Sequence, residues 1–447
     1  MKKFFQKIKE IWSIEDLRKR LMYTAGLVLV FRLGTYVILP GIDAEAYNSL
    51  STANGTGGLL GLINLFAGGG FSRASIFALG IMPYISASIA MQLLAIAVPY
   101  FARMQKEGES GRRKMNQYTR YLTVIVTAVQ ASGYFAYLKQ MSAQGDFITA
   151  PMGLFWTICV MMLTAGTLFT MWMGERITDR GIGNGISLLI MIGIIAGLPA
   201  AIVNEFTHRA DNMVPFVLEI AFLVLVIMGC ILLVQGTRRI PVQYAKRVVG
   251  TRQYGGVRQY IPLKINAAGV MPIIFAQALM FIPGTIAQFN PNWENSAFLA
   301  TLNDFQSVWY NVIYGTLIVV FTYFYTAIII NPTQIADDLK KNGGFIPGVK
   351  PGKKTAEFID NVLSRITLPG SIFLAMVAIA PVVTRAFDVD TSFAHFFGGT
   401  SLLIMVGVIL DTLQQVESHL LMRHYDGLMK TGRVKGRSSA AVNVPQG

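Results

Sequence analysis

The side chains that usually perform catalysis or hold metals are few in this chain and lie far apart in the sequence. The two cysteines fall inside apolar segments, and no paired-cysteine, HExxH or P-loop pattern is present. Each of the four histidines falls near the end of an apolar segment, where solvent at a membrane surface explains it: His208, His395, His419 and His424. We therefore expect no catalytic residue, no metal site and no cofactor.

Acidic residues inside the apolar segments are also few. Asp411 lies within the last such segment, where a carboxylate serves either as a proton relay or as a hydrogen-bonded structural group. Glu219 lies toward the outer end of another segment. Neither residue supplies an internal source of energy, so work done by this protein must be driven by a partner.

Basic residues form the one chemically distinctive pattern, in two long polar segments. Residues 235–266 carry no acid and seven basic side chains: Arg238, Arg239, Lys246, Arg247, Arg252, Arg258 and Lys264. Residues 331–367 carry lysines, Lys350 among them, around the turn sequence FIPGVKPG. A polybasic loop is typical of a topology signal in contact with lipid. It also suits docking of an anionic partner such as ribosomal RNA or an acidic protein.

The elements that position these residues are membrane spans. The chain has 447 residues, of which 53% are hydrophobic and 14% charged, with a mean hydropathy of +0.50. Soluble proteins carry about a quarter charged residues, so this composition indicates a membrane protein. Segment length and apolarity predict about ten spans. They lie near 21–39, 73–98, 119–138, 153–173, 184–203, 214–235, 267–288, 309–331, 367–384 and 401–421.

The distribution of positive charge predicts the orientation. With the N-terminus inside, nearly all Lys and Arg residues fall in cytoplasmic segments, and both termini are cytoplasmic. The exceptions lie in spans or outer loops: Arg32, Arg73, Lys139, Arg209 and Arg385. The opening sequence MKKFFQKIKEIW places apolar residues on one helical face and lysines on the other. This pattern is typical of an interfacial helix on an anionic leaflet.

A short apolar segment precedes the second predicted span. As a helix at 1.5 Å per residue, 59–67 would be only about 14 Å long against roughly 30 Å of hydrocarbon. Glycines bound it on both sides, at Gly57–Gly58 and at Gly68–Gly70. It is either a movable stopper on the wall of a conduit or a re-entrant surface segment.

An internal repeat links the two halves of the chain. The sequence GIMPYI at 80–85 in the second span is echoed by GVMPII at 269–274 in the seventh. Because the offset of five spans is odd, two halves built on this repeat have opposite orientations in the membrane. The repeat therefore predicts a central pathway between inverted halves.

Several longer motifs resemble the SecY family of bacterial protein translocase channels. They are SRASIFALGIMPYISASI, QKEGESGRRKMNQYTRY, MWMGERITDRGIGNGIS, IPLKINAAGVMP and FGGTSLLI, and the resemblance runs from about Ile14 to Met429. It implies an all-α polytopic membrane protein with about ten transmembrane helices in two inverted halves around a central pore. As one membrane domain over 1–447, it has a cytoplasmic amphipathic N-terminus (1–20), a first half (21–203), a second half (210–421) and a cytoplasmic tail (422–447).

The resemblance also implies the positions of functional residues. A pore ring falls on isoleucines from four spans: Ile81, Ile85, Ile190, Ile274 and Ile404. A plug helix falls on 57–70, with Leu59, Leu60, Leu62, Ile63, Leu65 and Phe66. A lateral gate between spans 2–3 and 7–8 includes Gln92, Asn266 and Gln277. The family's site for the ribosome or the motor ATPase SecA falls on Arg238, Arg239, Lys246, Arg247, Arg252, Arg258 and Lys350. Lys350 stands where the family commonly has Arg, and it lacks the planar bidentate fork of that residue.

These expectations describe a passive, partner-driven protein-conducting channel of the bacterial inner membrane, with no enzymatic activity. Unfolded preproteins would cross it, and apolar signal peptides would leave sideways into the lipid bilayer. The implied partners are SecE, SecG, SecA and the ribosome. The alternative is a secondary transporter of a small solute, which needs convergent polar groups at the midplane. An intramembrane enzyme lacks a nucleophile–base pair.

Overall fold

The computed structural model is mostly helical. It describes residues 12–54, 59–143, 145–210, 213–244, 247–249, 252–254, 258–277, 279–280, 307–385, 387, 389, 391–394, 396 and 399–430. The first half contains α2 (Glu15–Gly34), α3 (Ala44–Asn54), α4 (Leu59–Phe66), α5 (Met82–Ala97), α6 (Pro99–Lys106), α7 (Glu109–Ser142), α8 (Met152–Arg180) and α9 (Gly185–His208). The helices of the second half are α10 (Met213–Gln235), α14 (Val308–Ile329), α15 (Pro332–Lys341), α16 (Lys353–Arg385), α17 (Thr391–Ala394) and α18 (Gly399–Lys430).

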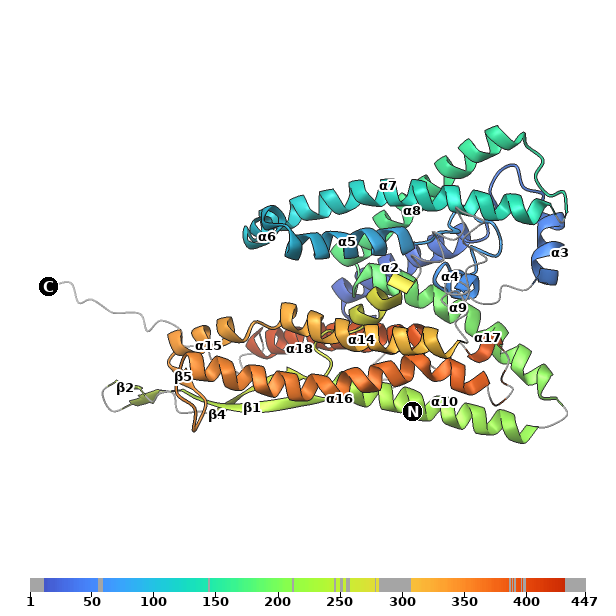
Figure 1. The fold of residues 1–447 in the computed structure, drawn as a ribbon. Coiled ribbons are helices and arrows are strands. Elements are labelled where there is room, and N and C mark those ends of the chain that lie inside the picture. Colours follow the sequence, from blue (N-terminus) through green and yellow to red (C-terminus); the bar gives the residue numbers. More distant parts are fainter. Residues whose placement is uncertain are drawn as a thin grey trace.

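The long helices form two layers that lie roughly parallel to each other (Figure 1). One layer holds α5, α7 and α8, and the other holds α10, α14, α16 and α18, while α4 and α9 lie between them. The helix α9 contacts α8 and α2 of the first half and α18 and α17 of the second. Each layer is therefore built from one half of the sequence, and α9 of the first half contacts both.

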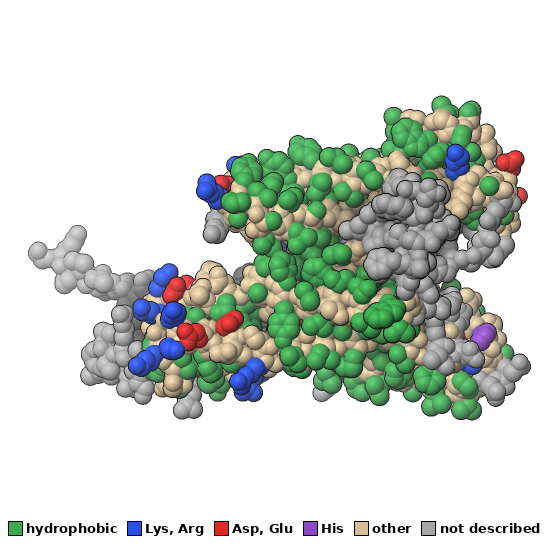
Figure 2. Space-filling view, viewed as in Figure 1, with side chains coloured by type: hydrophobic (Ala, Val, Ile, Leu, Met, Phe, Trp, Pro, Cys, Tyr) green, Lys and Arg blue, Asp and Glu red, His purple; other side chains and the backbone are tan. Residues whose placement is uncertain are grey.

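The surface between the two ends of the helices is apolar. Figure 2 shows hydrophobic side chains over the middle of both layers, with charged side chains concentrated toward the ends. Large apolar residues such as Met161, Leu218 and Leu232 are 68%, 65% and 69% exposed, which a soluble protein would avoid. This belt is the surface that lipid covers in a multi-pass membrane protein.

Seven helices in the described part of the chain are long and apolar enough to cross a membrane. They are α7, α8, α9, α10, α14 with α15, α16 and α18. An eighth is counted if α5 and α6, which meet at 103°, form one broken span. The mostly helical membrane fold is confirmed, whereas the count of ten spans stays a prediction, in part because 281–306 lie outside the described residues.

The second predicted span is shorter than its sequence suggested. We expected it from about Arg73, but α5 begins at Met82, and the preceding residues form turns. Gly80 has a φ of +54°, a left-handed conformation that interrupts a helix, and Pro83 in the first turn of α5 favours a helix start. Apolarity alone therefore overestimated this helix by about nine residues at its N-terminal end.

The two basic loops contain β-structure that the sequence analysis did not predict. The first loop forms β1 (Thr237–Tyr244), β2 (Arg247–Val249), β3 (Arg252–Tyr254) and β4 (Arg258–Lys264), and the second contributes β5 (Gly344–Phe345). Strand β1 pairs antiparallel with β4 on one side and with β5 on the other. A small core including Ile240, Leu263 and Ile359 holds this sheet against α15 and α16. The two loops are thus one folded unit.

Candidate functional site

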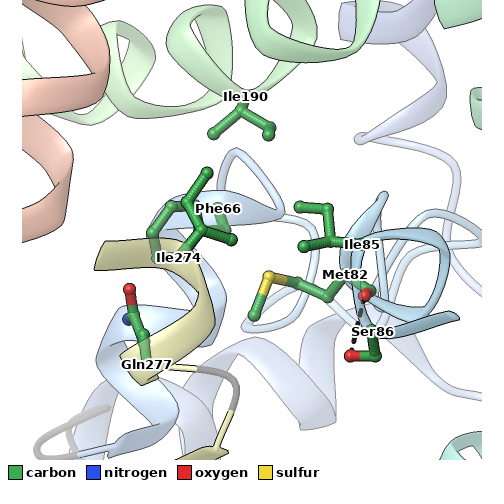
Figure 3. A pocket seen from close by; sticks show the side chains of 7 residues that line it. All are labelled: Phe66, Met82, Ile85, Ser86, Ile190, Ile274 and Gln277. Atoms are coloured by element: carbon green, nitrogen blue, oxygen red, sulfur yellow. Dashed lines mark hydrogen bonds between the residues drawn. The ribbon is translucent and has the colours of Figure 1, made fainter. Parts of the chain in front are cut away.

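A cavity lies where the two layers meet, next to the end of α4 (Figure 3). Its empty space measures about 290 Å³, part of which is open to solvent. The lining residues come from four separate helical segments and are mostly apolar: Phe66, Met82, Ile85, Ser86, Ile190, Ile274 and Gln277. The hydroxyl of Ser86 donates to the carbonyl of Met82 at 3.2 Å, so it is already bonded within its own helix. The cavity therefore presents little unsatisfied polarity.

The five isoleucines expected around a pore lie in one hydrophobic cluster. Ile81, Ile190 and Ile404 are buried at 3%, 3% and 1% exposure, and Ile85 and Ile274 pack against the same cluster. Three of the five, Ile85, Ile190 and Ile274, line the cavity. Ile81 and Ile404 lie in the surrounding cluster and do not line it.

The internal repeat has the same backbone geometry in both copies. Gly80 and Gly269 have φ values of +54° and +65°, and each precedes a helix. In the first copy the N–H of Ile85 donates to the carbonyl of Ile81, and in the second the N–H of Ile274 donates to that of Val270. The bonds occupy equivalent positions in GIMPYI and GVMPII. Each glycine therefore starts a helix that brings one isoleucine to the cavity.

The short apolar segment is a helix, α4, and its end packs closely on α9. Phe66 is buried at 5% exposure and Leu65 packs against the same cluster, while the side chains of Leu59, Leu60, Leu62 and Ile63 lie outside those described. A Cβ placed on Gly193 of α9 would lie 3.1 Å from the Phe66 carbonyl oxygen and 3.2 Å from the Gly68 nitrogen. A side chain at residue 193 would force α9 and this segment apart by a few tenths of an ångström, so the glycine favours their close approach.

A side-chain hydrogen bond also fixes the end of α4. Nη1 of Arg32, on α2, donates to the carbonyl oxygen of Gly68 at 2.6 Å. Backbone bonds from Gly69 to Asn64 and from Gly70 to Ala67 close the turn that follows the helix. The segment is therefore held by polar contacts with α2 and close packing on α9, in addition to the apolar packing of Leu65 and Phe66.

A second contact between the halves joins α5 to α14. The hydroxyl of Tyr325 donates to Oε1 of Gln92, and the Tyr325 ring meets Phe275 edge to face at 5.0 Å. Gln277 and Asn266 are buried at 5% and 8% exposure, and Oδ1 of Asn266 has no hydrogen-bond partner among the described residues. Of the three expected gate residues, Gln92 belongs to this seam and Gln277 lines the cavity beside α5, whereas no contact of Asn266 with the seam is seen among the described residues. The sequence analysis did not predict Tyr325 and Phe275 as gate residues. An aromatic residue in an apolar span does not indicate that it contacts the other half of the chain.

The expected docking residues lie in the β-structured unit. Arg238 and Arg239 are exposed on β1, and Lys350 is exposed in the turn before α16, where its carbonyl accepts a bond from Thr355. Lys246 lies outside the described residues, and so do the side chains of Arg247, Arg252 and Arg258, whose backbones belong to β2, β3 and β4. Register pairs Gln243 with both Arg258 and Phe345, so the second loop joins the sheet that carries the basic residues of the first.

One lysine of the second loop is paired and another is not. Nζ of Lys354 lies 2.9 Å from Oε2 of Glu357, and this hydrogen bond raises the pKa of Lys354 and lowers that of Glu357. Lys350 has no ion-pair partner within the described part of the chain. Lys350 is therefore the more available of the two for an anionic partner.

The structure supplies no arrangement for group-transfer chemistry in its described part. No group of three or more His, Cys, Asp or Glu side chains there is placed to hold a metal ion. Cys159 and Cys230 are buried and unpaired. Asp411 is exposed on α18 and has no hydrogen bond or ion pair among the described residues, so our interpretation of it as a hydrogen-bonded structural group has no support.

Comparison with known proteins gives consistent matches. A family model for SecY matches residues 75–413. The protein translocase subunit SecY of Streptomyces coelicolor is 44% identical over 428 residues, covering 93% of this chain and 97% of that protein. SecY of Mycobacterium tuberculosis is 43% identical over 437 residues, with coverage of 93% and 97%.

Solved structures resemble the fold over nearly its whole length. A structure described as a protein conducting channel matches with a TM-score of 0.61 at 15% identity, covering 96% of this chain and 95% of its own. Sec61 in the canine ribosome–channel complex matches with a TM-score of 0.57 at 15% identity and the same coverage. At such identity, the structural likeness establishes the fold alone.

Proposed function

The chain belongs to the SecY family of protein-conducting channels, and we propose that the cavity between its two halves is the closed waist of the pore. As a protein translocase subunit it is a multi-pass protein of the bacterial inner membrane. We propose which residues seal, plug and open this channel. One observation carries it: Ile85, Ile190 and Ile274, from three separate helices, line one cavity together with Phe66 of α4.

An apolar waist suits a channel that must pass many different polypeptides. Branched aliphatic side chains around a narrow opening exclude water, and without water ions do not cross. The same side chains offer no hydrogen bond that would retain a passing chain. We assign the remaining isoleucines, Ile81 and Ile404, to the packing that supports this seal, since both are buried in the same cluster.

The helix α4 fits the role of a plug. At eight residues it is too short to span a bilayer, and its Phe66 borders the cavity. Its end is held by one hydrogen bond from Arg32 and by close backbone packing on Gly193. Displacement of the plug must break these contacts and withdraw Phe66 from its apolar cluster. A solved structure of a SecY protein attributes closed-state stabilisation and the membrane seal to its plug domain, and we extend that role to α4.

The seam between α5 and α14 fits the role of a lateral gate. It joins the two halves through a polar contact, Gln92 to Tyr325, and through the aromatic contact of Tyr325 with Phe275. An apolar segment of a substrate can replace the aromatic contact, whereas the hydrogen bond must break. The seam therefore sets a threshold of hydrophobicity that a substrate must exceed to enter the lipid.

The β-structured unit fits the role of a docking surface for a cytoplasmic partner. It presents exposed basic residues from two loops, with Arg238 and Arg239 on β1 and Lys350 in the turn before α16. We propose that this surface binds the ribosome or SecA, and that SecE and SecG accompany the chain. The canine and yeast channels of the same fold were solved as complexes with ribosomes, which supports this assignment. Both termini then lie on the cytoplasmic side with these loops.

The test of this function is uptake of a preprotein by the reconstituted channel. Proteoliposomes that contain the chain with SecE and SecG should take up a signal-bearing preprotein when SecA and ATP are added. A secondary transporter would instead accumulate a small solute along an ion gradient and leave the preprotein outside. The apolar lining of the cavity disfavours that alternative, because solute and ion sites need convergent polar groups.

A further inference from the structure

Two arginines lie together beside the end of α4, on the same aromatic ring. The guanidinium carbon of Arg32 lies 5.2 Å from the centroid of the Tyr36 ring, and that of Arg73 lies 4.2 Å from it. Nη2 of Arg32 also contacts the Tyr36 hydroxyl at 3.4 Å. Two cations on one ring repel each other, so this arrangement favours an anion nearby.

No carboxylate in the described part of the chain compensates this charge. Every ion pair there involves other residues, and neither arginine has a further partner. Arg32 directs one donor to the Gly68 carbonyl, and this leaves other guanidinium donors unused. Nη1 of Arg73 is buried without any hydrogen-bond partner. A buried guanidinium donor left unpaired destabilises the folded protein.

Two buried hydroxyls in the same turn are also unpaired. Oγ of Ser75, a residue with 0% exposure, has no partner, and neither has Oγ of Ser72. Arg73 and Ser75 reach two adjacent glycines of the turn: a Cβ placed on Gly69 would lie 3.4 Å from Nη1 of Arg73, and one placed on Gly70 would lie 2.7 Å from Oγ of Ser75. Unpaired guanidinium and hydroxyl donors therefore lie along the three consecutive glycines at 68–70.

The backbone of this turn holds the donors in place. The carbonyl of Ala74 accepts from the N–H of Leu39, and Ser75 forms an isolated bridge with Ile38. These contacts fix 74–75 against the segment that follows Tyr36. Arg32, in the last turn of α2, and Arg73, in the turn before Ser75, are thus followed in the chain by residues that are bonded to each other.

We infer that Arg32 and Arg73, with the hydroxyls of Ser72 and Ser75, form a phosphate-binding site at the end of the plug helix. Guanidinium groups bind phosphate through several donors at once, and a phosphate carries enough acceptor oxygens to satisfy hydroxyls as well. Carboxylates offer fewer acceptors. The site is separate from the basic docking surface, since the α4 end lies well away from β2 and β5 (Figure 1).

The surroundings admit a lipid headgroup as well as free phosphate. Leu33, Tyr36 and Val37 are 62%, 55% and 49% exposed, so the site borders the apolar belt that faces lipid. Either source presents the same phosphate oxyanion to the arginines. The two sources are distinguished by whether an acyl chain improves binding.

The test uses the purified channel complex in a neutral detergent and follows its thermal unfolding. Inorganic phosphate is titrated against chloride at equal ionic strength, and dihexanoyl phosphatidylglycerol is titrated separately. We expect phosphate or the lipid to stabilise the wild type and Arg73→Gln to weaken the apparent affinity at least tenfold, about 1.4 kcal/mol. Ser75→Ala, a smaller change, should weaken it several-fold and covers the case in which Arg73→Gln folds poorly.

Lys139→Gln is the matched control, because Lys139 is an exposed cation of the same predicted side and lies outside the site. It should bind phosphate like the wild type. If the lipid binds more tightly than free phosphate and displaces it, the ligand is a lipid headgroup. If free phosphate binds more tightly than the lipid and displaces it, the ligand is soluble phosphate. Either outcome supports the site. If Arg73→Gln and Ser75→Ala titrate like the wild type with both probes, these donors bind water only and the inference is wrong.

Discussion

A single methyl group on Gly193 should displace the plug. In the Gly193→Ala variant the new Cβ would lie 3.1 Å from the Phe66 oxygen, 3.2 Å from the Gly68 nitrogen and 3.3 Å from the Gly68 Cα. These are backbone atoms, which cannot rotate away as a side chain can. Either α4 moves or α9 moves, and α9 is fixed by contacts with α8 and α18. We therefore expect the plug to yield.

The size of the effect follows from this overlap. Overpacking by one methyl typically costs about 1 to 3 kcal/mol. Applied to the closed state alone, this shifts the equilibrium between seated and displaced plug by roughly 5- to 150-fold. Replacement of glycine by alanine also stabilises a helix by about 1 kcal/mol, but that gain is present whether or not the plug is seated.

A matched control lies one turn along the same helix. A Cβ on Gly197 would meet only side-chain atoms, 3.5 Å from Phe396 and 3.8 Å from Leu65, which are ordinary contacts. Gly197→Ala therefore carries the same gain in helix propensity without the overlap. In planar bilayers without substrate, Gly193→Ala should open more often than the wild type, and Gly197→Ala should not. Equal resting conductance of the two variants would refute the proposed seating of the plug.

Three further predictions concern the gate, the docking surface and the orientation. Tyr325→Phe removes the bond to Gln92 and should ease gate opening by about 1 kcal/mol, so that substrate segments of marginal hydrophobicity enter the lipid more often. The control is Tyr323→Phe, which loses only an exposed bond to a backbone carbonyl. Equal partitioning into lipid in the two variants would count against the gate. Arg252→Glu should weaken SecA or ribosome binding and leave the resting conductance unchanged. The loss of affinity should be largest at low salt, because salt screens exposed charges. An unchanged affinity would leave the loop as a topology signal only. A cysteine at Lys350, in a background without Cys159 and Cys230, should react with an impermeant thiol reagent only from the cytoplasmic side, and labelling from outside would reverse the orientation.

Short-range sequence patterns predicted much of this fold. Apolar length located the long helices, and the repeat at 80–85 and 269–274 located two of the cavity residues, Ile85 and Ile274, because both copies impose the same glycine-led helix start. The resemblance to a known family added Ile190, which no local pattern singles out. These features depend on neighbours within a few residues or on an inherited pattern.

Features that depend on distant contacts were not predictable. Tyr325 and Gln92 are 233 positions apart, and neither residue type indicates the other. The pairing of β5 with β1 joins two loops that are far apart in the sequence and share no pattern that would predict their contact. The late start of the predicted second span arises from the left-handed backbone at Gly80, which packs against Ala67. A hydropathy pattern contains no information on such packing.

The central claim is that isoleucines from separate helices seal the pore. Its most direct test is the resting ion conductance of the Ile85→Ser, Ile274→Ser double variant in planar bilayers. Serine at both symmetric positions removes apolar surface from the cavity and admits water, so conductance should rise well above that of the wild type while preprotein uptake persists. A control with Ile125→Ser and Ile328→Ser, both on the exposed surface, should remain ion-tight. If the cavity variant is as ion-tight as this control, these isoleucines do not seal the pore and the assigned pore axis is wrong.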